Sequence, residues 1–377
     1  MFKMMEQRFE TPRPKPRRAY NPNRFNALDS GIVFAIILVM FYGVSFAVSK
    51  LFGTQLRALY QYDVYAYMIV SLLVSQLTVF LVAAVYSLVR KTNPFCGGGY
   101  VAKVDGVQIL MSFILIMGIM MTLYHSHLQF GADAEKILGE GFTPDNNLSP
   151  FSGIFALIYI AISVLCPAIF EEMLFRGIIM RGLEQLGSVA AIVLSSVAFA
   201  LMHGNFSQLI LQFFGGLAIA SVVTLTGNFL LGSLMHGFNN LFAIFYGILI
   251  QNLDESFVGG YLQAATDASL ILIGVAFLTI SGIYFIKLAF EKQKRELQGK
   301  PLVGKFDDVR FYEEVENGET KLVPHYVKPE TVGFGEDDER LFKIEGKYRK
   351  INKKAPIAAS YIVFGAGILL AIILIFI

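Results

Sequence analysis

Ionisable and imidazole side chains are rare in the apolar stretches of this chain, and those present form three short patterns. A charged group at membrane depth costs about 2.5–3.5 kcal/mol on insertion scales, so such groups are typical of functional sites. Carboxylates, imidazoles and amides are also the groups that transfer protons and stabilise oxyanions in hydrolytic reactions. The three patterns are Glu171-Glu172-x-x-x-Arg176, Phe199-x-x-x-His203 and His236-x-x-x-Asn240.

Helical spacing assigns different roles to these side chains. Glu172 and Arg176 are four residues apart with the acid first, an arrangement that favours an ion pair on one helix face. We interpret this pair as structural support for the site. Glu171 is rotated by about 100° from Glu172, which turns it away from that pair. The polar groups that remain to share one cavity are Glu171, His203, His236 and Asn240.

A carboxylate, two imidazoles and an amide in a partly hydrated, low-dielectric pocket suit peptide hydrolysis. In one scheme Glu171 and His203 polarise a water molecule as the general base, while His236 and the Asn240 amide donate to the developing oxyanion. In the other scheme, Glu171, His203 and His236 bind Zn²⁺ with an open position for water, and Glu172 or Asn240 acts from outside the ligand set. The same residues serve both schemes, so the sequence leaves both open.

The composition is that of a membrane protein. Of the 377 residues, 55% are apolar and only 16% are charged, whereas soluble proteins carry about 25% charged residues. A bilayer core about 30 Å thick requires about 20 apolar residues of helix. We therefore predict an all-α polytopic membrane protein with eight to nine transmembrane helices. The candidate runs lie near 31–49, 66–89, 107–124, 154–180, 188–203, 207–225, 229–250, 268–286 and 355–377.

The distribution of Lys and Arg predicts the orientation of these spans. When the nine runs alternate across the membrane, 27 basic residues fall on the side of the N-terminus and only Lys50, Arg57 and Lys136 fall on the other. Since basic residues concentrate in cytoplasmic loops, the N-terminus should be cytoplasmic and the C-terminus outside. The net charge of the chain is only +2, which gives no argument for nucleic-acid binding.

One long polar segment, residues 291–354, lies between the last two apolar runs and carries 15 basic and 14 acidic residues. Within it, Asn317-Gly318 separates two strand-like runs, which is the strongest short signal for a hairpin. We predict a small cytoplasmic insert that contains a β-hairpin. The resulting division is a basic tail (1–30), a transmembrane domain (31–290), the insert (291–354) and a C-terminal transmembrane helix (355–377).

Taken together, the three patterns resemble the CAAX protease and bacteriocin-processing family of intramembrane endopeptidases, which includes the type II CAAX prenyl endopeptidases and bacterial lysostaphin-resistance proteins. The resemblance covers residues 154–250. It implies a protease core in a membrane, in bacteria the plasma membrane, acting on a membrane-embedded or lipidated peptide. It also implies that the catalytic carboxylate is Glu171, with Glu172 and Arg176 as its supporting pair, and that the catalytic or ligand positions are His203, His236 and Asn240.

Three functional classes fit these observations. An intramembrane endopeptidase, either metal-free or zinc-dependent, is the main hypothesis. The alternative is a non-catalytic membrane scaffold that docks a protein partner through the insert 291–354. A proton- or ion-coupled transporter is the third class, because a chain of carboxylate and histidine groups can relay protons. The sequence shows no pair of repeated halves, which counts against a transporter.

Overall fold

The computed structural model describes residues 25–90, 94, 105–138, 153–205, 208–251, 257–297, 309–316, 319–326 and 357–375. Most of the predicted basic tail, the Asn317-Gly318 turn and most of the predicted insert therefore lie outside the described residues. What is described is helical, apart from one pair of strands.

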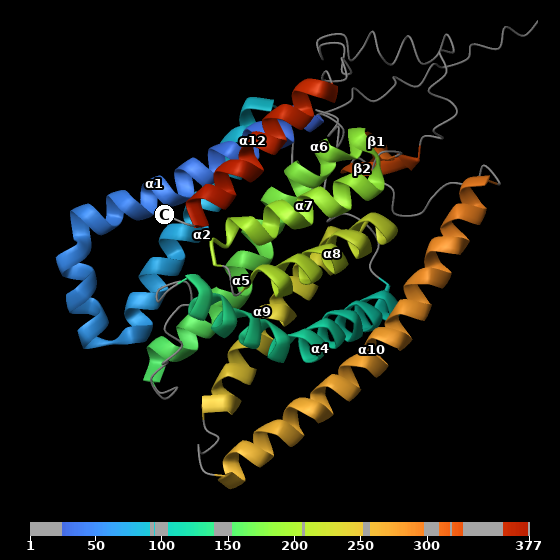
Figure 1. Cartoon of the computed structure of the whole chain (residues 1–377). Helices are drawn as coiled ribbons and strands as arrows, with labels where there is room; N and C mark the ends of the chain where they lie inside the picture. Colours follow the sequence, from blue (N-terminus) through green and yellow to red (C-terminus); the bar gives the residue numbers. More distant parts are fainter. Residues whose placement is uncertain are drawn as a thin grey trace, which may run out of the picture.

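The helices gather into one bundle, in which α12 runs beside α1 along one side and α10 runs beside α4 along the other (Figure 1). The helical segments that carry the three polar patterns lie between the α1–α12 pair and the α4–α10 pair (Figure 1). The elements in chain order are α1 (Ala27–Tyr62), α2 (Val64–Arg90), α4 (Gly106–Leu138), α5 (Gly153–Leu174), η2 (Phe175–Met180), α6 (Arg181–Leu183), η3 (Glu184–Leu186), α7 (Ser188–Met202), α8 (Leu209–Thr226), α9 (Phe229–Gln251), α10 (Phe257–Leu297), β1 (Val309–Glu316), β2 (Glu319–Tyr326) and α12 (Ile357–Ile375).

Helices α1 and α2 form a hairpin with local start and stop signals. The Asn26 side chain accepts from the Asp29 backbone N–H, and the Asp29 carboxylate accepts from the Asn26 N–H, a reciprocal cap that starts α1. Asp63 separates the two helices and accepts from two backbone N–H groups of the first turn of α2. The predicted run 31–49 covers only part of α1, because a helix continues into polar sequence until a residue such as Asp63 breaks it.

The predicted span 154–180 is one continuous helical segment that runs from α5 to η3, even though it contains Pro167. Its middle part, η2, is a π-helical turn. In a π-turn, each backbone carbonyl pairs with the N–H five residues later and not four. The Ile179 carbonyl in this turn also accepts from the Ser30 hydroxyl of α1 at 2.8 Å. The continuity past Pro167 keeps Glu171 and Glu172 inside the helical segment.

The last part of the chain differs in one respect from the predicted boundaries. Helix α10 has 41 residues and ends at Leu297, so it continues into the predicted insert 291–354. Strands β1 and β2 pair antiparallel, with Val309 opposite Tyr326 and Glu316 opposite Glu319. This register leaves a two-residue connection at the Asn317-Gly318 position.

The relative directions of the packed helices follow from which residues meet. Along the pair α2 and α5, the Tyr65 and Tyr159 rings lie 5.9 Å apart and the Phe80 and Phe170 rings 4.9 Å apart, so these two helices run parallel. The Phe34 and Phe364 rings meet at 5.5 Å where α1 packs on α12. That pair is also parallel, because Gly31 lies against residues 363–364 and Phe34 against residue 367.

Two other pairs run antiparallel. In α4 and α10, Gly118 lies against Leu278 while Gly274 lies against Thr122. In α5 and α9, residue numbers also change in opposite senses, since Ser163 meets Asn240 and Glu172 meets His236. These directions are the ones that result when nine spans alternate across a membrane.

Within the described residues, seven helical segments are long and apolar enough to cross a membrane. They lie in α1, α2, α4, the α5–η3 segment, α8, α10 and α12. The two other predicted runs also form helices: α7 is a shorter apolar helix of 15 residues, and α9 carries the polar residues of the third pattern. The polytopic helical architecture is therefore present, while the count of nine membrane crossings stays a prediction.

Candidate active site

A buried ion pair between Glu172 and Arg176 lies at the centre of the site. Arg176 Nη1 lies 2.7 Å from Glu172 Oε1, and the two side chains are only 1% and 0% exposed. The second guanidinium nitrogen donates to the Gly216 carbonyl of α8 at 3.0 Å, and Arg176 Cζ lies 4.7 Å from the ring centroid of Phe199 on α7. The predicted i,i+4 ion pair is thus present, and two further helices hold its cation.

His236 of α9 is bound directly to this pair. Its Nδ1 lies 2.8 Å from Glu172 Oε1, and because a carboxylate oxygen accepts, Nδ1 is the donor. The other ring nitrogen, Nε2, lies 3.8 Å from Glu171 Oε2. The His236 ring is buried and is held between the two neighbouring carboxylates.

Glu171 has one oxygen that is bound and one that is available. Its Oε1 accepts from Gln76 Nε2 of α2 at 2.7 Å. Its Oε2 is buried and has no hydrogen-bond partner among the described residues. A buried acceptor of this kind requires an explanation, and a hydrogen donor supplied by water or substrate is a sufficient one.

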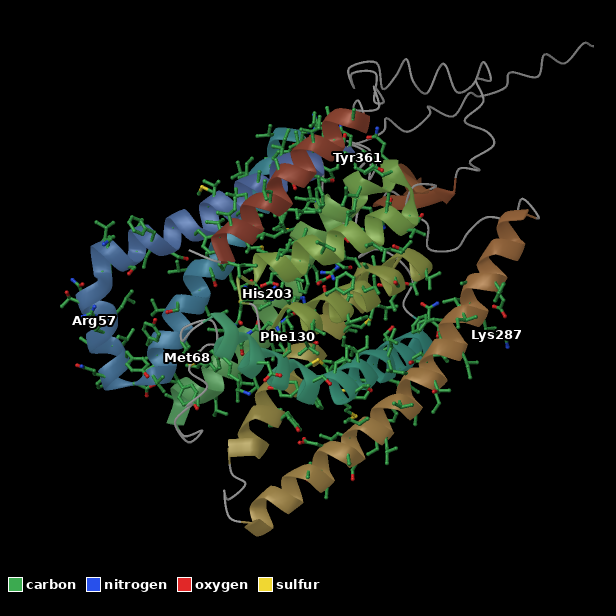
Figure 2. All side chains as sticks on the ribbon, viewed as in Figure 1. Arg57, Met68, Phe130, His203, Lys287 and Tyr361 are labelled. Atoms are coloured by element: carbon green, nitrogen blue, oxygen red, sulfur yellow. The ribbon has the colours of Figure 1, made fainter. Side chains whose placement is uncertain are left out.

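His203 follows the last residue of α7 and lies inside the bundle (Figure 2). Its Nδ1 donates to the Phe199 carbonyl at 2.8 Å, which leaves the Nε2 lone pair as its acceptor. The Phe199 ring contacts both imidazoles edge to face, with centroids 4.8 Å from His203 and 5.5 Å from His236. His203 also interacts electrostatically with Glu171 and His236. Phe199 therefore fixes both imidazole rings from one side.

The four-residue spacing predicts that Asn240 shares a cavity with His236, but in the structure its amide binds the backbone of α5. Its Nδ2 donates to the Ser163 carbonyl at 3.0 Å, and its Oδ1 accepts from Asn239 at 3.3 Å. The side chain therefore bridges α9 to α5 two helical turns before Glu171. One N–H of the amide is used in this bridge, and a second N–H belongs to the same nitrogen.

The candidate metal ligands Glu171, His203 and His236 are neighbours, but they do not converge. Across the part of the chain that the structure describes, no three His, Cys, Asp or Glu side chains are grouped to hold one metal ion. Phe199 contacts the two imidazoles, and Glu172 binds Nδ1 of His236. As placed among the described residues, these three side chains do not form a ready three-ligand zinc site.

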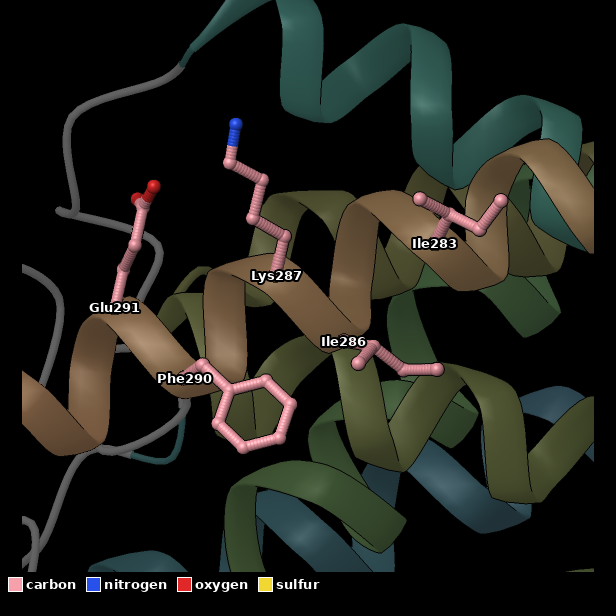
Figure 3. Close-up of a pocket in the computed structure, with 5 residues that line it drawn as sticks. All are labelled: Ile283, Ile286, Lys287, Phe290 and Glu291. Atoms are coloured by element: carbon pink, nitrogen blue, oxygen red, sulfur yellow. The ribbon is translucent and has the colours of Figure 1, made fainter.

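A cavity of about 450 Å³ lies elsewhere, on the surface of α10 (Figure 3). Lys287 and Glu291 point to one side of this helix and Phe290 to the other. All residues that line the cavity belong to α10, and none belongs to the three patterns. The cavity is therefore separate from the candidate active site.

Gln76 is the site residue that sequence reasoning missed. It is 4% exposed and binds Glu171 across 95 positions of sequence. Ionisable and imidazole side chains mark the three patterns, and an amide inside an apolar run is a weaker signal of the same kind. The run 66–89 contains this amide in its interior, so a search for every strongly polar side chain at membrane depth would have found it.

Comparison with known proteins agrees with the resemblance seen in the patterns. Residues 153–242 match the family model described as "Type II CAAX prenyl endopeptidase Rce1-like". No curated protein and no solved structure matches the chain. The matched segment runs from α5 into α9 and contains all three patterns. The chain is therefore an integral membrane protein whose segment 153–242 is similar to the type II CAAX prenyl endopeptidase Rce1-like family.

Proposed function

We propose that this protein is an intramembrane endopeptidase that hydrolyses a peptide bond of a membrane-embedded or lipidated substrate. The observation that carries the proposal is the buried Oε2 of Glu171, which has no hydrogen-bond partner among the described residues and lies 3.8 Å from His236 Nε2. A carboxylate with one oxygen held and one free beside an imidazole is suited to general-base work. The match to a protease family over the same residues supports this reading.

In the proposed reaction, Glu171 and His203 activate water. Glu171 Oε2 takes one proton from the water, and His203 Nε2 accepts a hydrogen bond from its other hydrogen. The water oxygen forms a bond to the substrate carbonyl carbon. The proton on Glu171 then passes to the amide nitrogen as the C–N bond breaks, which yields one new carboxyl and one new amine terminus.

His236 and Asn240 are the proposed donors to the oxyanion that forms in this step. His236 must then carry hydrogens on both ring nitrogens, because Nδ1 already donates to Glu172. Asn240 must use the N–H that does not bind the Ser163 carbonyl. Donors held in place in a dry site act more strongly than in water, and one such donor contributes about 10²–10³ in rate.

We propose that the nine spans alternate across the membrane, with the N-terminus cytoplasmic and the C-terminus outside, in a bacterial plasma membrane. The parallel packing of α1 on α12 supports this, since both helices then enter from the same side. The segment between α10 and α12 shares that side with the N-terminus. The 27-to-3 distribution of basic residues supports a cytoplasmic location for that side.

The test is cleavage of a fluorogenic library of membrane-embedded and prenylated peptides by the purified protein in detergent. Glu171→Gln should lower kcat by about 10²–10⁴, the usual contribution of general-base catalysis. Glu291→Gln is the matched control, because Glu291 is exposed on α10 outside the site. If wild type cleaves no faster than Glu171→Gln while the control matches wild type, the protease assignment is wrong.

A zinc-dependent version of the same reaction remains the alternative mechanism. Glu171, His203 and His236 would be its ligands, after side-chain rotations that bring them together. Metal analysis and a chelator titration decide between the two versions. The side-chain mechanism predicts full activity in metal-free protein, whereas loss of activity that only Zn²⁺ restores would establish the metal version.

A further inference from the structure

The buried amide of Gln76 donates a hydrogen bond to Glu171, the proposed catalytic carboxylate. Its Nε2 donates to Glu171 Oε1 at 2.7 Å, and the residue is 4% exposed. It lies on α2, outside the segment 153–242 that matches the protease family. The contact therefore adds a helix to the site that the family match does not include.

The neighbouring polar residue of α2 behaves differently. Thr78 is 6% exposed, and its hydroxyl donates to the Val74 carbonyl of its own helix at 2.8 Å. That bond satisfies the hydroxyl without any tertiary partner, as is common for Thr in helices. Gln76 instead reaches across the helix interface. Burial of an amide in an apolar helix costs free energy unless the amide forms hydrogen bonds. The direction of Gln76 toward Glu171 therefore points to a role for this amide at the candidate site.

The packing of α2 on α5 holds Gln76 in this position. The Phe80 and Phe170 rings contact each other at 4.9 Å, beside the contact of Gln76 with Glu171. A second aromatic contact, between Tyr65 and Tyr159, holds the other end of the same parallel interface. These two aromatic contacts fix the rotation and register of α2, the helix from which Gln76 extends.

The chemistry of the two groups determines which end of the amide faces Glu171. An ionised carboxylate only accepts hydrogen bonds, so the NH₂ end of Gln76 must point to it. The amide oxygen, Gln76 Oε1, is buried and has no hydrogen-bond partner among the described residues. Within the part of the chain that the structure describes, the hydrogen bond to Glu171 therefore sets this orientation of the amide.

We propose that Gln76 is the positioning residue for Glu171. It binds Oε1 and so prevents rotation of the carboxylate, which keeps Oε2 directed toward His236 Nε2 at 3.8 Å. The position of Oε2 determines where the activated water molecule lies relative to the scissile bond. This inference rests on the proposed endopeptidase function, and it makes α2 a structural part of the active site.

The experiment compares kcat and KM of purified Gln76→Met, Gln76→Glu and Thr78→Val with those of wild type, per folded molecule. Met keeps the length of the side chain and removes the donor, while Glu keeps its shape and places a second acceptor against Glu171. Displacement of a catalytic group by about 1 Å can cost about 100-fold. We expect kcat to fall about 10- to 100-fold in both Gln76 variants with KM within about twofold of wild type. Thr78→Val should retain the kcat of wild type.

The outcomes separate this inference from the function on which it rests. If wild type shows no Glu171-dependent cleavage, the endopeptidase proposal fails. If wild type cleaves and either folded Gln76 variant keeps a wild-type kcat, the endopeptidase proposal stands and the positioning role is wrong. A variant with low folded yield but normal kcat per folded molecule, or an equal loss in Thr78→Val, would likewise show a packing role only.

Discussion

The Nδ1 atom of His236 and the Nη1 atom of Arg176 bind the same oxygen of Glu172, at 2.8 Å and 2.7 Å. One carboxylate oxygen thereby connects α9 to the α5–η2 segment, and the same guanidinium reaches α8 through the Gly216 carbonyl. Glu172 is fully buried, so the connection lies in a low-dielectric interior. The supporting pair therefore also orients one of the two imidazoles.

Glu172→Gln should destabilise the protein more than it changes its cleavage specificity. The substitution leaves Arg176 buried without a counter-charge, and removal of one partner of a buried ion pair costs about 3–5 kcal/mol. Thermal unfolding in detergent measures the loss, and Asp133→Asn is the control, because the pair of Asp133 with Lys136 is exposed. A fully stable Glu172→Gln protein that has lost activity would contradict the supporting role.

Gly216→Ala should lower both stability and kcat. A Cβ at this position would lie 3.1 Å from Phe199 Cδ1 and 3.5 Å from Arg176 Nη2, so the added methyl group presses on the ring that contacts both imidazoles. Forced shifts of this kind in a packed core cost about 1–3 kcal/mol.

Gly282→Ala is the matched control for this substitution, because nothing lies within 4 Å of a Cβ at Gly282 on α10. In a helix, Ala is otherwise favoured over Gly by about 0.8–1.0 kcal/mol, so the control should not lose stability. Equal thermal unfolding and equal kcat for the two variants would show that the approach of α8 to Phe199 is not tight.

Asn240→Ala tests whether Asn240 only bridges α9 to α5 or also donates to the oxyanion. Loss of the bond to the Ser163 carbonyl should cost about 1 kcal/mol of stability. Loss of an oxyanion donor should lower kcat by about 10²–10³ with a small change in KM. Ser163→Ala is the control, because it keeps the carbonyl that Asn240 binds and removes only a hydroxyl bonded within α5. An unchanged kcat in Asn240→Ala would restrict this residue to the bridge.

The membrane orientation can be measured with reporter fusions. Alkaline phosphatase, which is active only outside the cytoplasm, should be active when fused after residue 377 and inactive when fused after residue 297. A cytoplasmic fluorescent reporter should give the reverse result. The expectation follows from the parallel contact of Phe34 with Phe364 and from the 27-to-3 charge distribution. Equal reporter activity at both positions would exclude a membrane crossing by α12.

The local features of the site were predictable from sequence. Glu172 and Arg176 form their ion pair because residues four apart share one face of any helix, whatever surrounds it. The apolar runs likewise predicted where helices occur, because the need to satisfy backbone groups in a membrane leaves few alternatives. The ends of α1 and α10 were less predictable, since a helix can outlast its apolar run.

Contacts across helices depended on the tertiary structure. The bond of Gln76 to Glu171 and that of His236 to Glu172 join residues 95 and 64 positions apart, and no sequence period relates them. Asn240 shares its spacing pattern with His236, yet it binds the Ser163 carbonyl, because the rotation of α9 against α5 sets its partner. Residue types therefore identified the chemical groups of the candidate site, while helix packing determined which oxygen of Glu171 binds Gln76 and which one lies beside His236 Nε2.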